Sequence, residues 1–142
     1  MSDYFLEVNN LTKHYLLNND FLSRLTGKTK TLKAVDDISF FLKHGETLGL
    51  VGESGCGKST TARLITRLVE PSGGSILLKG EDILSLPAAR MLEMRKSMQL
   101  VFQDPYSSLN PRKTVMQILS RPLAVHRLAR GWTAQRREVL HL

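Results

Sequence analysis

The sequence predicts an α/β fold organised around a strand, a glycine-rich turn and a helix. Glu46–Val51 is a short apolar run, Gly52–Ser59 follows it, and apolar residues then recur at helical spacing as far as Val69. In this context, the spacing Gly-x-x-x-x-Gly-Lys-Ser is typical of a P-loop. The strand predicted at Leu32–Leu42 joins the next strand through a tight turn, which indicates an antiparallel sheet beside a parallel one. We therefore expect a P-loop core with an accompanying antiparallel β subdomain.

The residue types of this loop suit the binding of a triphosphate. Glycines at three positions let the backbone turn successive N–H groups inward around an anion. The helix that begins near Lys58 adds unpaired amides, and the Lys58 ammonium can reach the β and γ phosphates, while Ser59 is the expected Mg²⁺ ligand. The alternative is a glycine turn that merely joins a strand to a helix. The predicted nucleotide-binding residues are Gly52, Glu53, Ser54, Gly55, Cys56, Gly57, Lys58, Ser59 and Thr60.

A second Gly-Lys-Thr sequence, at Gly27–Thr29, does not repeat this pattern. Leu22 occupies the position where the first glycine of a P-loop is required. We interpret this segment as a polar loop.

The composition limits the classes of function that the chain can have. A length of 142 residues corresponds to one domain but is short for a complete nucleotide-hydrolysing domain. The net charge of +7 is compatible with nucleic acid or an anionic membrane as partner. However, the basic residues are dispersed and no aromatic residues are interleaved with them, so we expect solvated basic faces and no nucleic-acid partner. No apolar run approaches the roughly 18 residues that cross a bilayer, and the N-terminus does not resemble a signal peptide.

Cys56 is the single cysteine, which excludes a disulfide or a multi-cysteine metal site within the chain and fits a reducing cytoplasm. Its place at a helix N-terminus beside Lys58 favours the thiolate. One hypothesis is that alkylation of this thiol blocks nucleotide binding and that nucleotide protects it. The alternative is a small residue that fills a variable loop position.

The N-terminal part predicts strands around a long polar loop. Phe5–Val8 alternates as a strand does, and Leu11–Tyr15 continues it. Leu16–Lys33 is expected to be a loop with one helical turn at Phe21–Leu25, and Asp36–Asp37 is expected to break or bulge the following strand. Tyr15 is either an aromatic that stacks on a purine or a core residue at a strand edge.

After the P-loop, the sequence predicts alternating helices and strands. The first helix is expected to continue to Val69 and to stop at Pro71. The elements expected after it are a strand at Ser75–Leu78, a helix from near Pro87 that ends before Ser97, a strand at Met98–Phe102, and helices at Thr114–Ser120 and Thr133–Leu140, each with a threonine N-cap.

Gln103 follows the second apolar strand. In an open α/β sheet the carboxyl ends of the strands face the ligand, so Gln103 is expected near the γ phosphate. Its amide oxygen can coordinate Mg²⁺ and orient an attacking water, but the amide is not a strong general base. The alternative is that Asp104 is a Walker B carboxylate displaced by one position.

Over nearly its whole length the chain resembles the N-terminal half of ABC-type ATP-binding domains. The resemblance is carried by GESGCGKST, PSGGSILLKGEDI and MQLVFQDP, and QDPYSSLNPR is most similar to the subfamily that serves oligopeptide, dipeptide and nickel importers. It implies that Tyr15 stacks on adenine and that Gln103 is the Q-loop glutamine. It further implies that residues 1–103 hold the β subdomain and P-loop core, and that 104–142 begin a helical subdomain. Asp104–Arg112 would lie near the transmembrane subunits.

Several motifs of that family do not occur in the sequence. There is no LSGGQ-type signature, no strand ending in Asp-Glu, and no switch histidine, since His126 and His141 come too early. Family members pair head to tail, so this chain resembles the P-loop half of such a domain and is interpreted as a truncated product or a fragment. The resemblance implies ATP and Mg²⁺ as cofactors, permease subunits and a second ATP-binding subunit as partners, and a peripheral place at the cytoplasmic face of the membrane. Binding of ATP without turnover is the expectation for these 142 residues.

Two other functions remain open from the sequence. One is a non-catalytic fragment that docks on membrane subunits without binding nucleotide. The other is a different P-loop enzyme, such as a small kinase or GTPase, although the chain has no Asn-Lys-x-Asp sequence and no DxxG after the second strand.

Overall fold

The computed structural model describes residues 4–17, 30–104, 106 and 108–141. The chain divides into two compact units, residues 1–87 and 88–142. The predicted division of the domain at residues 103 and 104 stays a prediction.

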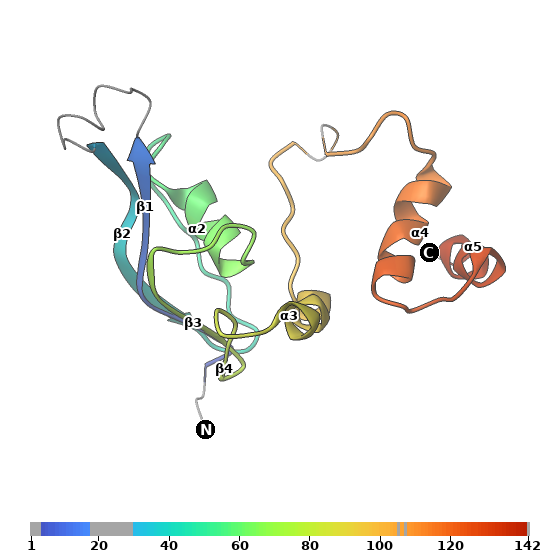
Figure 1. Cartoon of the computed structure of the whole chain (residues 1–142), viewed down its shortest axis with the longest axis horizontal. Helices are drawn as coiled ribbons and strands as arrows, with labels where there is room; N and C mark the ends of the chain where they lie inside the picture. The colour runs from blue at the N-terminus through green and yellow to red at the C-terminus, as the bar shows by residue number, and fades with distance from the viewer. Residues whose placement is uncertain (1–3, 18–29, 105, 107, 142) are drawn as a thin grey trace. The chain divides into compact units, whose positions relative to one another are not determined.

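The first unit contains an antiparallel sheet of four strands in the order β2-β1-β3-β4 (Figure 1). The strands are β1 Leu6–Leu17, β2 Lys30–Leu42, β3 Gly73–Leu78 and β4 Glu81–Asp82. The expected loop at residues 16–33 was wrong at both ends, because Leu16 and Leu17 pair with Thr31 and Lys30. The helical turn expected at residues 21–25 and the polar loop at 27–29 lie outside the described residues.

The register of β1 and β2 shifts at bulges near the middle of the pair. Leu11 pairs with Ile38 and Lys13 with Val35, so β2 has an extra residue at the predicted Asp36–Asp37 position. Asp37 has φ 54°, and Asn10 of β1 has φ 47°. Asparagine and aspartate tolerate this left-handed conformation better than other residues with a Cβ. The Asn10 amide donates a hydrogen bond of 2.8 Å to the Asp37 carboxylate, which fixes the two irregular positions against each other.

The core of the first unit lies between the sheet and helix α2, Lys58–Ile65. α2 begins at the predicted residue and contributes the fully buried Leu64, and it contacts β2. Burial of an aliphatic side chain of this size stabilises the fold by about 1.5–3 kcal/mol. The other buried apolar residues of this unit are Val8, Leu11, Val35, Ile76, Leu78 and Ile83. The helix that carries Lys58 is therefore anchored on the sheet.

Helix α2 ends at Ile65, so the prediction that it continues to Val69 and stops at Pro71 was wrong. Arg67 adopts φ 49°, its N–H donates to the Leu64 carbonyl at 2.9 Å, and the N–H of Leu68 donates to the Arg63 carbonyl at 2.8 Å. These two bonds form a Schellman motif, which closes a helix whatever the hydrophobic pattern that follows.

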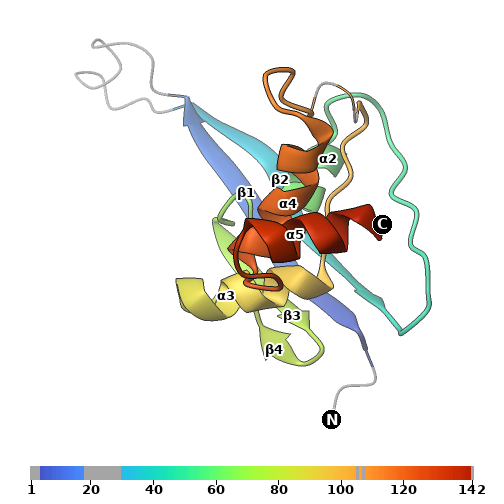
Figure 2. The ribbon, with the colours of Figure 1, turned by 90° about the vertical axis from the view of Figure 1, so that its right-hand side faces the viewer.

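The segments 46–51 and 98–102 are not strands, which corrects both predictions. Figure 2 shows the connection from β2 to α2 as an extended path without a strand arrow. Val51 is 97% exposed and Val101 is 77% exposed. Parallel strands are apolar because neighbouring strands and helices cover both faces. Both segments have the apolar composition of core strands. Among the described residues, neither segment pairs with a strand, so no sheet covers their side chains.

The second unit is helical, with α3 Ala88–Met94, the 3-10 turn η1 Arg95–Ser97, α4 Val115–Val125 and α5 Trp132–Leu140. The predicted N-cap of α4 is confirmed: Thr114 and Gln117 form a reciprocal capping box. α4 continues past the expected Ser120 and includes Pro122. The predicted Thr133 N-cap of α5 was wrong, because the N-cap is Gly131. Its φ of 80° favours glycine.

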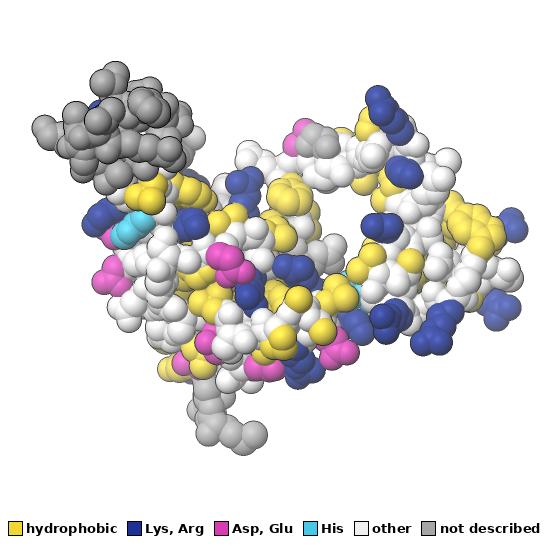
Figure 3. Space-filling view, viewed as in Figure 1, with side chains coloured by type: hydrophobic (Ala, Val, Ile, Leu, Met, Phe, Trp, Pro, Cys, Tyr) yellow, Lys and Arg dark blue, Asp and Glu magenta, His cyan; other side chains and the backbone are white. Residues whose placement is uncertain are grey.

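Lys and Arg side chains are scattered over the visible face of both units among other side-chain types (Figure 3). Among the described residues, no helix has both the length and the apolar character needed to cross a membrane.

Candidate functional site

The candidate site is the loop 52–57 and the first turn of α2, which follows it in the first unit. Gly57 is the N-cap of α2, with φ 98° and ψ −3°, and no side chain accepts a hydrogen bond from the first amides of the helix. The first turn contains no acidic residue. An α-helix leaves its first four N–H groups without backbone partners, and its positive dipole end attracts anions. The start of α2 is therefore suited to a phosphate group.

Lys58 lies across the loop and holds it closed. Its Nζ donates hydrogen bonds of 2.7 Å to the carbonyl of Gly52 and of 2.7 Å to the carbonyl of Glu53. Cys56 Sγ lies 3.4 Å from the same ammonium. The ammonium is thus at the centre of the turn, bound to neutral oxygens. A charged phosphate oxygen forms a stronger hydrogen bond than a carbonyl does, so an anion in the loop would compete for these donors.

Two of the glycines lie in close contacts, and the contact of Gly57 requires a glycine. A Cβ on Gly57 would lie 2.3 Å from the Ala34 carbonyl oxygen of β2. A Cβ on Gly52 would lie 2.6 Å from Cys56 Sγ. The first contact is with backbone, which cannot move aside as a side chain can. The P-loop is therefore seated directly against strand β2.

Two hydroxyl residues of α2 face different environments. Thr61 is buried, and its hydroxyl donates to the Gly57 carbonyl at 3.1 Å. Ser59 is exposed beside the loop. Mg²⁺ prefers oxygen ligands and usually keeps several waters. The exposed Ser59 hydroxyl next to the phosphate cradle fits one ligand of such an ion, whereas the Thr61 hydroxyl is already bound to backbone.

Tyr15 belongs to the same unit as the P-loop and lies near the end of β1. It pairs with Leu32 of β2 and is 38% exposed. Lys13 Nζ lies 5.0 Å from the centre of its ring. Tyr15 is therefore not a core residue, and its exposed area is available to a base.

The β2 residues beside the loop also carry an ion-pair network. Asp36 Oδ2 accepts a hydrogen bond of 3.0 Å from Lys33, and Asp36 Oδ1 lies 3.3 Å from His14 Nε2. The Lys33 hydrogen bond, followed by that of His14, holds the pKa of Asp36 below its usual value of 3.8. Asp36 therefore stays ionised at neutral pH.

Gln103 and Asp104 belong to the second unit. Gln103 is exposed. Asp104 Oδ1 accepts a hydrogen bond of 3.1 Å from the N–H of Tyr106, and its backbone carbonyl accepts one of 3.2 Å from Ser108. This is an Asx-type turn, so the carboxylate of Asp104 stabilises the local turn. The predicted role of Gln103 near the γ phosphate stays a prediction.

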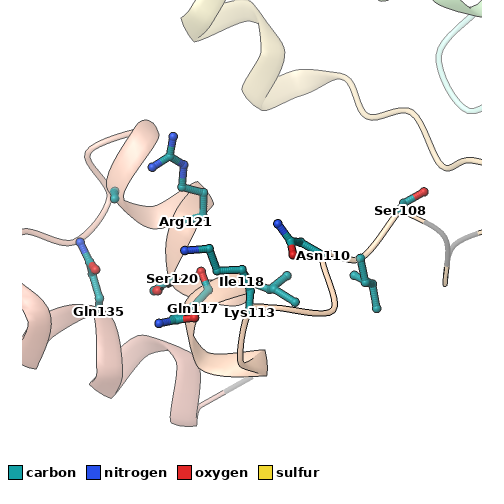
Figure 4. Close-up of a pocket in the computed structure, with 10 residues that line it drawn as sticks. Ser108, Asn110, Lys113, Gln117, Ile118, Ser120, Arg121 and Gln135 are labelled. Carbon is teal, nitrogen blue, oxygen red and sulfur yellow. Dashed lines mark hydrogen bonds between the residues drawn. The ribbon is translucent and has the colours of Figure 1, made fainter.

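A pocket of about 650 Å³ lies within the second unit, beside the predicted partner-binding segment (Figure 4). Lys113 and Arg121 line it together with uncharged residues. Its remaining lining residues are Ser108, Leu109, Asn110, Gln117, Ile118, Ser120, Ala124 and Gln135.

The family pattern described as ABC transporter matches residues 35–141, which include the P-loop, Gln103 and both C-terminal helices. The chain belongs to the ABC transporter family. The resemblance inferred from the motifs is thereby confirmed.

Two relatives in the ABC transporter family are named for peptide or oligopeptide transport. The chain is 49% identical, over 87% of its length, to a probable peptide ABC transporter ATP-binding protein of Sinorhizobium fredii, of which it covers 34%. It is 46% identical, over 92% of its length, to the oligopeptide transport ATP-binding protein OppF of Bacillus subtilis, of which it covers 40%. The chain therefore spans between a third and two fifths of the length of these curated relatives.

A solved structure of an ABC cassette has the same fold. It is a dimeric ATP-binding cassette in a post-hydrolysis state, bound to ADP and Pi. The TM-score is 0.73 at 24% identity, with 96% of this chain and 54% of that chain covered. The predicted α/β class of the ABC type, with its antiparallel β subdomain, is confirmed by this likeness, even though the two core segments 46–51 and 98–102 are unpaired.

Two features of the site were not predicted from the sequence. One is the contact of Gly57 with the backbone of Ala34, which depends on the packing of α2 against β2. The other is the position of Lys13 over the Tyr15 ring. The alternation of the sequence Lys-His-Tyr could have indicated the second, since residues two apart in a strand lie on one face.

Proposed function

We propose that the protein is an ATP-binding subunit that energises the import of peptides or a related solute through a membrane ABC transporter. The observation that carries the proposal is the P-loop closed by Lys58, with uncapped α2 amides and the exposed Ser59 hydroxyl beside it. The names of the peptide and oligopeptide relatives support the solute class.

Each site residue has a role in this proposal. The loop amides and Lys58 bind the β and γ phosphates, Ser59 contributes a hydroxyl oxygen to Mg²⁺, and Tyr15 stacks on adenine. Mg²⁺, when bound, neutralises charge on the phosphates. Gln103 orients the attacking water through its amide, which places it among the residues that act at the γ phosphate.

The proposed partners are permease subunits and a second ATP-binding subunit. The segment Asp104–Arg112 forms the contact with the permease, at the cytoplasmic face of the membrane. The antiparallel sheet and P-loop form one half of a nucleotide site, and the second subunit supplies the other half. Phosphoryl transfer needs stabilisation of charge from more than the P-loop alone.

For the 142-residue chain we expect ATP binding without turnover. Isothermal titration with Mg²⁺-ATP should show binding that Lys58→Ala weakens by at least about tenfold, since one or two charge-assisted hydrogen bonds of about 1.5–3 kcal/mol each are lost. Phosphate release should not exceed that of the Lys58→Ala variant.

Three results would contradict the proposal in different ways. Mg²⁺-dependent ATPase activity above the Lys58→Ala level would refute binding without turnover. Absence of binding by the unmodified chain would favour a non-catalytic fragment that docks on the permease. A preference for GTP over ATP would favour a different P-loop enzyme.

A further inference from the structure

We infer that Lys13 is a positioning residue for the nucleotide base: it holds the Tyr15 ring in place and strengthens its stacking on a purine. This inference rests on the proposed function, in which Tyr15 is the stacking residue. Lys13 itself does not contact the nucleotide.

The first step is that Lys13 and Tyr15 act from the same face of the sheet. They are two residues apart in β1, and side chains alternate between the faces of a strand. Lys13 pairs with Val35, which is buried, and Gly57 packs against Ala34 and Val35. Directly opposite residues of an antiparallel pair point to the same face. Lys13 and Tyr15 are thus on the face that carries α2 and the P-loop.

The second step is the distance from the loop to the aromatic ring. From the β2 residues that touch Gly57, the path to Tyr15 crosses one strand spacing of about 4.8 Å and two residue rises of about 3.3 Å each. The Tyr15 backbone is therefore on the order of 10 Å from the β2 residues against which Gly57 packs. An extended nucleoside triphosphate is longer than this.

The third step is that the Lys13 ammonium has two partners, a backbone carbonyl and the Tyr15 ring. Its Nζ donates a hydrogen bond of 2.6 Å to the Glu70 carbonyl, in the segment after α2. The same Nζ lies 5.0 Å from the Tyr15 ring centre, within the range of a cation–π interaction. The segment after α2 and the ring are thus tied to one ammonium group, which restricts the rotamers of Tyr15.

The fourth step is the effect of the cation on stacking. An aromatic ring has a negative face, and two such faces repel when they stack. A cation over one face withdraws π density from the ring and reduces this repulsion on the opposite face. With one face of Tyr15 directed at Lys13, the remaining exposed area is the surface on which a base can stack.

The test compares nucleotide affinity in single and double variants of the full chain. Lys13→Met should weaken binding of Mg²⁺-ATP by about 2- to 5-fold. This factor corresponds to the free energy of a cation–π interaction between exposed or partly buried groups. It should leave binding of Mg²⁺-tripolyphosphate, which has no base, unchanged. In a Tyr15→Ala background, Lys13→Met should have no further effect on ATP affinity, and Tyr15→Phe should retain the sensitivity to Lys13.

Lys79, in the turn between β3 and β4, provides a matched control within the same unit. Its Nζ lies 5.3 Å from the centre of the Phe5 ring, and it pairs with no predicted nucleotide residue. Lys79→Met removes a similar cation–π contact and should leave ATP affinity unchanged.

The possible failures are distinguishable. Equal weakening of ATP and tripolyphosphate by Lys13→Met would show a general structural role and overturn the inference. Unchanged ATP affinity, or an additional loss in the Tyr15→Ala background, would also overturn it. Absence of ATP binding by the unmodified chain would overturn the proposed function itself and the inference with it.

Discussion

Gly57 is the residue at which the sheet and the P-loop constrain each other most closely. Its φ of 98° and the Ala34 carbonyl, 2.3 Å from the position of a Cβ, both oppose a side chain. Gly55 has a similar φ of 85° but open space around it. Gly55→Ala should therefore cost about 1–2 kcal/mol for the left-handed backbone alone, whereas Gly57→Ala should cost more and should also weaken ATP binding.

Chemical denaturation monitored by circular dichroism, together with ATP titration, measures both effects. Because the two substitutions are chemically identical, their difference isolates the contact with Ala34. Equal losses of stability in the two variants would show that the loop can move away from β2 at no cost.

Cys56 offers a second residue-scale prediction. Its thiol is exposed and lies 3.4 Å from Lys58 Nζ. An alkyl group on Sγ would occupy the turn that Lys58 crosses, so alkylation should block nucleotide binding and bound Mg²⁺-ATP should slow the reaction. Mass spectrometry of the alkylated fraction over time measures this rate. Equal rates with and without ATP would support the alternative in which Cys56 merely fills a loop position.

At the scale of elements, two helices end with the same backbone hydrogen bonds but differ in the side-chain hydrogen bonds at that end. Arg67 after α2 and Arg127 after α4 both have positive φ and both follow a Schellman pattern of backbone bonds. The Arg67 guanidinium also donates to the carbonyls of Ile83 and Leu86 at 2.9 and 2.8 Å. It thereby ties the end of the P-loop helix to the segment that follows β4.

Substitution of these two arginines by glycine should change the free energy of local opening in opposite directions. Arg67→Gly should lower the free energy of opening around residues 66–69 by about 1–3 kcal/mol, because half-buried carbonyls lose their donors. Arg127→Gly should raise it slightly, by less than about 1 kcal/mol, since glycine adopts positive φ without strain. Native-state hydrogen exchange at each helix end measures both. A loss at Arg127 as large as at Arg67 would mean that the side-chain bonds of Arg67 contribute little.

The local sequence predicted some of these elements and not others. Three predicted features depend only on residues a few positions away, so the local sequence was enough to predict them. They are the Thr114 cap, the start of α2 and the bulge at Asp36–Asp37. The end of α2 could not be read from Pro71, because the guanidinium partners of Arg67 lie 16 and 19 residues further along the chain. The Gly131 N-cap was missed because Thr133, two residues later, is the better cap by residue type alone.

At the scale of the whole molecule, the P-loop pattern predicted the fold class and the candidate phosphate site. The pattern did not predict that Glu46–Val51 and Met98–Phe102 would be unpaired. Their apolar composition indicates strands, but a strand forms only when a neighbour satisfies its backbone groups. The described residues form one antiparallel sheet, in which neither segment takes part.

The P-loop and Gln103 belong to different units of the chain. The P-loop and Tyr15 belong to one unit, so the path from Gly57 through β2 to Tyr15 follows from strand register. Gln103 belongs to the other unit, and its role at the γ phosphate rests on the family resemblance.

In the proposed site, the amides of the loop 52–57 and the first turn of α2 bind a triphosphate with the help of Lys58. Amide-resolved NMR spectra of the 142-residue chain, recorded as Mg²⁺-ATP is added, test it most directly. The largest shifts should fall on the N–H groups of residues 52–60, and these shifts should vanish in Lys58→Ala. Saturable shifts confined to other residues, with the amides of 52–60 unchanged, would contradict it.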